Sequence, residues 1–127
     1  MRVLALDHLV LTVADIEATV AFYQALGMQR VTFGGGRVAM AFGRQKLNLH
    51  QSGAEIEPHA RHPGPGSADL CFLVDLPPEA LSAHLEQQGI AIELGPVPRT
   101  GAAAALVSVY VRDPDGNLVE LSTEAAA

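Results

Sequence analysis

The sequence of 127 residues has no tryptophan and only one cysteine. A lone cysteine, Cys71, excludes a disulfide within the chain and fits a reducing compartment, so we expect a cytoplasmic protein. No apolar run approaches the ~20 residues that span a bilayer, and the N-terminus shows no signal-peptide pattern. We therefore expect neither a membrane span nor secretion.

Basic residues are also scarce. Lysine and arginine number 8 against 14 aspartate and glutamate, which gives a formal net charge of −6. An acidic surface repels phosphate backbones, so nucleic acid is not an expected partner. The hydrophobic fraction of 49% and the charged fraction of 17% are typical of a globular protein, and the length suits one domain. The expected ligand is therefore a small molecule.

The two halves of the sequence repeat one order of elements. Each half predicts a strand, a helix and three further strands, or βαβββ. The strands expected in the first half are 6–13, 28–34, 37–42 and 45–51, and those in the second half are 68–75, 90–94, 106–112 and 117–122. We place the two modules at 4–52 and 67–123, joined by a linker rich in proline and glycine at 53–66, all within one domain of 1–127.

Helix ends and turns are also visible. Asp15 suits the N-cap of the first helix and Gly27 its end, because an aspartate accepts from free amides of the first turn and glycine tolerates positive φ. Pro77 and Pro78 suit the first turn of the second helix. The segment 113–117, Asp-Pro-Asp-Gly-Asn, predicts a tight turn between the last two strands.

Side chains that bind metals recur at matched places in the two halves. His8 is matched by Asp69 at the start of each module, and His50 is matched by Glu120 in the last strand of each module. Two imidazoles and two carboxylates on the edge strands of two like modules suggest one metal ion on a pseudo-two-fold axis. Such a set suits Fe(II), Mn(II), Ni(II) or Zn(II), and ligand type does not choose among them.

Each of these residues also has a simpler interpretation. His8 could be a half-exposed strand histidine bonded to a carbonyl, and Glu120 could face solvent. His50 lies on the opposite strand face from its apolar neighbours, so it faces the interior if those neighbours pack on the helix. Asp69 is open between direct ligation and a hydrogen bond to a metal-bound imidazole. Glu120 is also the residue that we expect to act in catalysis.

Three further residues are candidates for contact with a substrate. Arg99 precedes a loop of small residues at 100–105 and could bind a carboxylate with two hydrogen bonds. Tyr110 and Cys71 are the other two, and Cys71 shares a strand face with Asp69. A surface role for Arg99 and a packing role for Cys71 remain alternatives. The linker histidines His59 and His62 are expected to be solvated.

The residues that carry a family resemblance lie along the whole chain. They are Asp7-His8-Leu9, Phe22-Tyr23 with Leu26-Gly27, and the segment 113–121, Asp-Pro-Asp-Gly-Asn-Leu-Val-Glu-Leu. With them the sequence resembles the vicinal oxygen chelate superfamily, which includes glyoxalase I, extradiol dioxygenases, and fosfomycin and bleomycin resistance proteins. The resemblance implies an α+β fold of paired βαβββ modules, forming a curved mixed sheet around a cup-shaped metal site. It also implies a homodimer.

A narrower resemblance rests on segments 46–51, 62–71 and 95–101. In these the sequence is similar to the subgroup named glyoxalase-domain-containing protein five or glyoxalase-family virulence protein. Carried over by position, the superfamily's metal ligands fall on His8, His50, Asp69 and Glu120. The position of His50 is usually glutamate in glyoxalase I and that of Asp69 is usually histidine, which argues against glyoxalase I activity itself.

These observations predict an enzyme that uses one divalent metal ion to chelate a small oxygenated substrate. The chemistry would be that of a lyase, an isomerase or a ring-cleaving dioxygenase. The alternative is a metal-free protein that binds a small molecule, as in the bleomycin-resistance type. The ligand-type residues favour the enzyme, because sequestration alone needs no such set.

Overall fold

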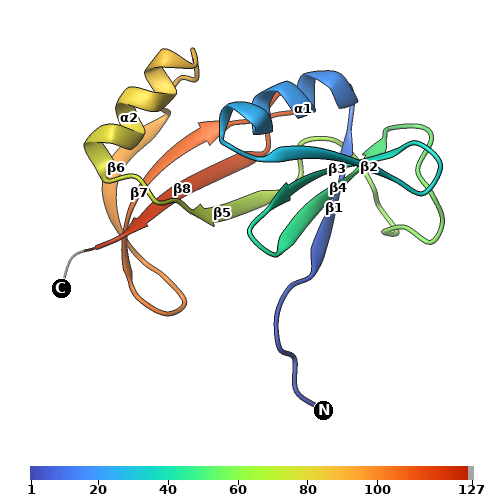
Figure 1. The fold of residues 1–127 in the computed structure, drawn as a ribbon, viewed down its shortest axis with the longest axis horizontal. Helices are drawn as coiled ribbons and strands as arrows, with labels where there is room; N and C mark the ends of the chain where they lie inside the picture. Colours follow the sequence, from blue (N-terminus) through green and yellow to red (C-terminus); the bar gives the residue numbers. More distant parts are fainter. Residues whose placement is uncertain (126–127) are drawn as a thin grey trace. The chain divides into compact units, whose positions relative to one another are not determined.

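The computed structural model describes residues 1–125, and the chain divides into two compact units, Met1–Ser67 and Ala68–Ala127. Each unit has one helix and one four-stranded sheet, as Figure 1 shows. The expected α+β class and the order βαβββ of each half are confirmed. We call them the first and the second unit.

The first unit has its strands in the spatial order β1-β4-β3-β2, with β1 and β4 parallel and the other pairs antiparallel. Its elements are β1 (His8–Val13), α1 (Ile16–Ala25), β2 (Gln29–Phe33), β3 (Arg37–Phe42) and β4 (Gln45–Gln51). The second unit repeats this pattern in the order β5-β8-β7-β6. Its elements are β5 (Asp69–Leu73), α2 (Pro78–Gln87), β6 (Leu94–Thr100), β7 (Ala105–Arg112) and β8 (Leu118–Glu124).

The first and last strands of each unit are direct neighbours. A parallel pair needs a long crossover connection, and here the helix and the two middle strands provide it. The last strand therefore lies inside its sheet, between the first strand and the third. This corrects the expectation that His50 and Glu120 lie on edge strands, because only β1 and β5 carry their ligand candidates at an edge.

Alternation along the strands gives each sheet one apolar face against its helix. In the first unit, Val20 and Tyr23 of α1 are buried, and α1 lies over one face of the sheet in Figure 1. The buried strand residues of the same core are Leu11, Val13, Val38, Met40, Leu47 and Leu49. In the second unit, Leu81 and Leu85 of α2 are the buried helix residues. The opposite face of each sheet is thus left to polar side chains.

The helix ends follow the sequence signals. The carboxylate of Asp15 accepts a hydrogen bond from the amide of Ala18 at 3.1 Å, and Asp15 has the extended backbone of an N-cap. Gly27 follows α1 with a φ of 98°, as a helix end requires. In the second unit Pro77 is the N-cap and Pro78 the first helical residue.

The turn at residues 113–117 fixes the start of β8. Both carboxylate oxygens of Asp113 accept hydrogen bonds, from the amides of Asp115 and Asn117 and from the Asn117 side chain. Asn117 in turn accepts at 2.8 Å from the amide of Ala68, just before β5. Gly116 has a φ of 84°, a value that other residues rarely adopt. The motif therefore connects the starts of the two parallel strands, β5 and β8, by a hydrogen bond.

The largest departure from expectation lies in β6. The strand expected at 90–94 begins only at Leu94 and runs to Thr100. It contains Pro96 and Pro98, which cannot donate to a ladder, and such residues are tolerated in an edge strand such as β6. Arg99 and Thr100 are consequently strand residues, and the loop shortens to 101–104, closed by the Gly101 amide donating to the Ala104 carbonyl at 2.9 Å.

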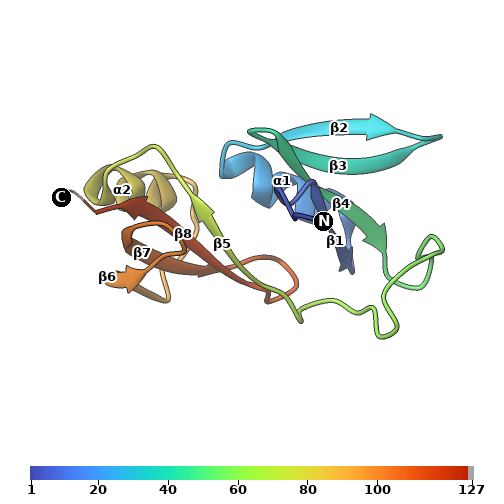
Figure 2. The same ribbon diagram turned by 90° about the horizontal axis from the view of Figure 1, so that it is seen from below.

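The two longest segments of the first unit outside helices and strands are 1–7 and 52–67. Residues 1–7 are exposed and extend away from the first sheet in Figure 1. Residues 52–67 follow β4 and form the long irregular connection visible in Figure 2. Among residues 1–125 no helix is long and apolar enough to cross a bilayer.

Candidate functional site

The polar face of the first sheet carries a pocket of about 360 Å³. Its wall comes from side chains of β1, β2, β3 and β4 that alternate with the core residues, and from the start of the connection after β4. The residues that line it are Asp7, His8, Val10, Phe33, Arg37, Lys46, Asn48, His50, Ile56, Glu57 and Pro58. A volume of this size is in the lower range of small-molecule sites. Both histidines expected as ligands thus line one pocket.

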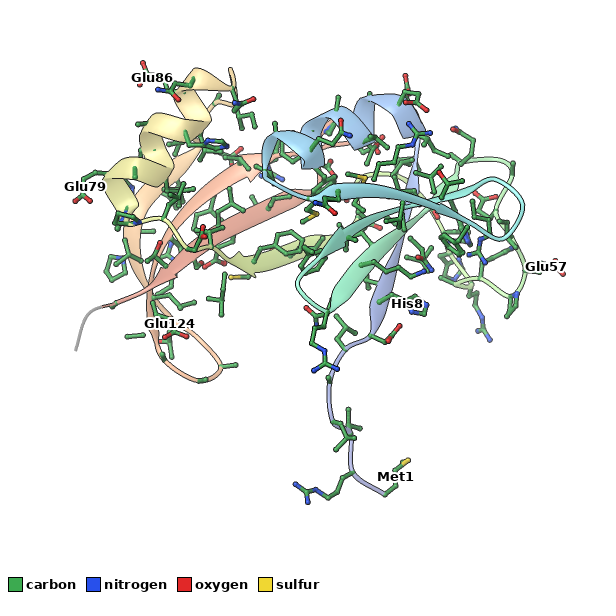
Figure 3. All side chains as sticks on the ribbon, viewed as in Figure 1. Met1, His8, Glu57, Glu79, Glu86 and Glu124 are labelled. Carbon is green, nitrogen blue, oxygen red and sulfur yellow. The ribbon has the colours of Figure 1, made fainter. Side chains whose placement is uncertain are left out.

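His8 stands at the rim of this pocket, at the first residue of β1 (Figure 3). Its Nδ1 lies 2.8 Å from a carboxylate oxygen of Asp7. A carboxylate at Nδ1 favours the tautomer with the proton on that nitrogen, so the lone pair of Nε2 is available to a ligand. The Asp7-His8 pair therefore has the arrangement of a histidine prepared to bind a metal.

His50 is nearly buried, with 4% of its surface exposed. Its Nε2 lies 3.5 Å from the guanidinium Nη2 of Arg37, and its Nδ1 is buried without a hydrogen-bond partner in the described part of the chain. Burial lowers the pKa of His50, and the nearby charges of Arg37 and His59 lower it further, while Glu55 acts in the opposite direction. The imidazole is therefore neutral at neutral pH, as a metal ligand must be.

The pairing registers place the ligand candidates differently in the two sheets. His8 lies opposite Lys46, so His50 is four residues beyond the partner of His8. Asp69 lies opposite Leu118, so Glu120 is only two residues beyond the partner of Asp69. If His8 corresponds to Asp69, the residue that corresponds to Glu120 is Asn48, not His50. Asn48 is 4% exposed, and its Oδ1 is buried without a partner among residues 1–125.

Two cations and one aromatic ring complete this face. The guanidinium carbon of Arg37 is 4.9 Å from the centre of the Phe33 ring, and Nζ of Lys46 is 3.7 Å from the same centre. Phe33 comes from β2, and Lys46 from β4 on the far side of β3. The ring thus draws both cations toward the middle of the face.

The connection after β4 contributes to the site. Pro58 and His59 join His50 in lining a second hollow of about 290 Å³. His59 Nδ1 lies 2.8 Å from the Ala60 carbonyl. His59 is exposed, as the sequence predicted, but it belongs to the surroundings of His50.

The polar face of the second sheet carries the acidic candidates. Glu120 lies directly opposite Cys71, and Asp69 is on the same face of β5. The Ser122 hydroxyl is 3.4 Å from the Glu120 carboxylate and 3.2 Å from Cys71 Sγ. Cys71 is exposed, yet partial burial and the negative charge of Glu120 raise the pKa of its thiol. Asp69, Cys71 and Glu120 thus share one surface.

Arg99 and Tyr110 interact with each other on this second sheet. Arg99 Nε donates to the Tyr110 hydroxyl at 2.8 Å, and its guanidinium carbon is 5.4 Å from the centre of the ring. Within residues 1–125, no three histidine, cysteine, aspartate or glutamate side chains gather at metal-binding distances. The polar face of the first sheet thus carries His8, His50 and two cations, and that of the second sheet carries Asp69 and Glu120.

A family model described as the Glyoxalase/Bleomycin resistance protein/Dioxygenase superfamily matches residues 5–121. The chain belongs to this superfamily. Its curated relatives in the superfamily include glyoxalase domain-containing protein RDO1 of Mycosarcoma maydis, at 52% identity over 97% of this chain and 70% of that protein. Virulence protein STM3117 of Salmonella typhimurium is 53% identical over 92% of this chain and 82% of its own length.

A solved structure agrees with this placement. An integron cassette protein of Vibrio cholerae, VCH_CASS1, is 56% identical and covers 98% of both chains, with a TM-score of 0.95. Both the superfamily and the virulence-protein subgroup expected from the sequence are confirmed.

Among the pocket residues that sequence reasoning did not single out are Asp7, Phe33, Arg37, Lys46 and Asn48. A signal was present for two of them. Lys46 and Asn48 alternate with His50 along β4, so all three share a face. The positions of Phe33 and Arg37 depend on the β2–β3 hairpin folding beside β4, which no local pattern reveals.

Proposed function

We propose that this protein is a divalent-metal-dependent enzyme that chelates a small oxygenated substrate. The proposed ligands are His8, Asp69 and Glu120, with a fourth donor from β4 that is either His50 or Asn48. The observation that carries the proposal is the pocket on the first sheet. It joins a histidine oriented by a carboxylate with two buried polar groups that have no partner in the described chain. Buried polar atoms are normally paired, so unpaired ones indicate a missing ligand.

The donor chemistry fits a divalent transition metal. Imidazole nitrogen, carboxylate oxygen and amide oxygen are all donors for Fe(II), Mn(II), Ni(II) or Zn(II). His50 is held neutral by its surroundings, and His8 presents Nε2. A metal ion bound there would supply Lewis-acid stabilisation of negative charge on an oxygen of the substrate.

The chain's own residues have separate tasks under this proposal. Asp7 would orient His8, and the Glu120 carboxylate would accept a proton from the substrate as a general base and return it as a general acid. Ser122 donates a hydrogen bond that orients the Glu120 carboxylate. Arg99 and Tyr110, already in contact, would bind a polar group of the substrate together. Cys71 would line the site beside Glu120.

The test is a calorimetric titration of metal-depleted protein with Mn(II), Fe(II), Ni(II) and Zn(II). We expect about one ion per chain, with binding weakened about 10-fold or more in His8→Ala and in Glu120→Gln. His62→Ala is the matched control, because His62 is an exposed histidine of the connection after β4 that lines no pocket described above, and we expect it to bind like the wild type. Absence of binding for all four metals would overturn the enzyme and leave the small-molecule-binding alternative.

We also propose that the protein forms a two-fold homodimer, the commonest closed assembly. Under this proposal, Asp69 and Glu120 could share a metal ion with His8 of the same chain or with His8 of a second copy. Mixing a His8→Ala chain with a Glu120→Gln chain distinguishes these cases. Recovery of up to half the metal binding indicates exchange between chains, and no recovery indicates pairing within a chain. A monomeric mass at micromolar concentration would contradict the dimer but not the site.

A further inference from the structure

Arg37 and Lys46 lack an acidic partner in the pocket of the first sheet. The ion pairs among residues 1–125 include His8 with Asp7, Arg30 with Glu17 and Arg112 with Glu93. Neither pocket cation takes part in one. A cation held over an aromatic ring rather than against a carboxylate keeps its charge available to a ligand.

Two carboxylates also line this pocket, and neither cancels these cations. Asp7 is already bonded to His8. Glu57 lies on the connection after β4, and Figure 3 shows its side chain at the outer edge of that connection, apart from His8. Arg37 and Lys46 therefore each bring to the pocket a positive charge that no ion pair found among residues 1–125 engages.

The unpaired polar atoms indicate what this charge would bind. Nε of Arg37 is buried and donates to nothing in the described chain, and it lies beside the His50 imidazole that the Arg37 Nη2 approaches. A guanidinium edge with a free Nε–H matches a carboxylate, which accepts two parallel hydrogen bonds from it. Lys46 would add a point charge to the same oxygens. An anionic oxygen group of a ligand would supply the partner that Arg37 Nε lacks among residues 1–125.

A metal ion and these cations oppose each other in the same pocket. A divalent ion held near His50 or Asn48 would lie close to the Arg37 guanidinium, and like charges repel strongly where water is excluded. An anion between them would be attracted by both. We infer that the pocket binds a small hydroxy or oxo acid carrying a second carboxylate, and that this anion and the metal bind cooperatively. The inference rests on the proposed function for its metal, but not for its anion site.

Coupling of this kind is reciprocal, so each ligand tightens the other by the same factor. The probes are Mn(II) with malate, whose hydroxyl and adjacent carboxylate can chelate while the distal carboxylate reaches Arg37. Lactate has the same chelating pair without the distal carboxylate. Calorimetry would measure Mn(II) alone, each acid alone, and Mn(II) at saturating acid. We expect malate to tighten Mn(II) binding about 5-fold or more, and lactate to do so by less than about 2-fold.

Variants locate the effect. Arg37→Gln should abolish the effect of malate on the affinity for Mn(II), and Lys46→Gln should reduce it. Two variants are used so that a folding defect in one of them does not decide the result. Arg30→Gln is the matched control, because it removes the same charge from the opposite face of the same sheet, where Arg30 pairs with Glu17. Chelation of Mn(II) by malate in solution is the same for every variant, so it cancels when variants are compared at one acid. The malate and lactate titrations are compared at equal free Mn(II).

The outcomes separate the two proposals. Mn(II) binding that malate does not tighten, or that malate tightens equally in Arg37→Gln, overturns the inference and leaves the proposed function standing. No binding of Mn(II), Fe(II), Ni(II) or Zn(II) overturns the proposed function and the cooperativity. In that sample, malate binding lost in Arg37→Gln but kept in Arg30→Gln would still support the anion site.

Discussion

The two units share an order of elements and a sheet topology, but their polar faces have opposite chemistry. The first presents imidazoles, Arg37 and Lys46 around one pocket. The second presents Asp69 and Glu120, with serine hydroxyls between its strands. A repeated scaffold has thus kept its apolar face and changed its polar one. The apolar face fixes the fold, while the polar face is free to specialise.

The units also differ in the side-chain hydrogen bonds that hold their parallel strand pair together. In the second unit the buried side chain of Asn117 bonds to the backbone before β5 and to Asp113. In the first unit the corresponding contacts come from Gln45 and Gln51, whose side chains donate to the carbonyls of Leu6 and Ala14 at 2.7 Å. Buried hydrogen bonds are costly to break, and exposed ones are replaced by water. The second unit therefore depends on a single residue more than the first.

The largest expected effect concerns the core of the second unit. Leu85→Ala should lower the free energy of unfolding by about 2–5 kcal/mol, because Leu85 is fully buried and its removal leaves a cavity. Urea denaturation measures the loss, and hydrogen exchange locates it. Amides of β7 should lose more protection than those of β3. Leu94→Ala is the control, since Leu94 is 48% exposed, and it should change stability by less than about 0.5 kcal/mol. Equal loss of protection in both sheets would show that the units share their stability.

The second effect concerns the shift of register between the sheets. Removal of a first-sphere ligand should weaken metal binding about 10-fold or more, or at least about 1.4 kcal/mol. The pairing registers predict that Asn48→Ala loses more affinity than His50→Ala. Calorimetry with the strongest-binding metal measures both. A larger loss in His50→Ala would favour the sequence correspondence of His50 with Glu120.

The third effect tests the fastening of the strand pairs. Asn117→Ala should destabilise the protein by about 1–3 kcal/mol, since it removes two buried hydrogen bonds of the Asn117 side chain and leaves the amide of Ala68 without its acceptor. Gln45→Ala removes a matching but exposed contact and should cost less than about 1 kcal/mol. Thermal denaturation compares them. Equal decreases in melting temperature for the two variants would show that the buried and the exposed hydrogen bonds contribute equally.

The smallest effect is on pH dependence, which should differ between the units. The pKa of His50 is lowered in the folded state, so the unfolded chain binds more protons below about pH 6.5 and stability falls as the pH decreases. The pKa of Cys71 is raised, so the folded chain keeps its proton longer and stability falls as the pH rises above about 8.5. His50→Gln should flatten only the acid side of a stability profile, and Cys71→Ser only the alkaline side. A profile unchanged by either variant would contradict the corresponding shift.

The sequence predicted the order of elements because turn residues and apolar periodicity are local signals. Gly27 and the 113–117 turn each ended an element where expected. β6 lies later in the chain than predicted, because Pro96 and Pro98 interrupt the apolar alternation that indicates a strand. An edge strand tolerates these prolines, since it needs only part of its backbone for pairing. The strand is therefore held by its neighbour β7 rather than by its own pattern.

The site residues stay a prediction. The repeat placed the candidates on the first and last strands of each module, where the structure has His8, Asp69, His50 and Glu120. Whether His50 or Asn48 matches Glu120 depends on the pairing with the first strand, which is a long-range property. Arg37 and Lys46 look like surface cations in the sequence. Only the hairpin that folds Phe33 beside them reveals that they share a pocket.

The exposure of Cys71 has a practical consequence. It is the only cysteine in the sequence, so a maleimide spin label would attach there without any engineering. Its raised pKa lowers the thiolate fraction at neutral pH, so labelling there should be slower than for an ordinary exposed cysteine. The label would sit opposite Glu120 on β8. Paramagnetic broadening of the label's spectrum by Mn(II) would then report, in solution, how close the ion binds to Glu120.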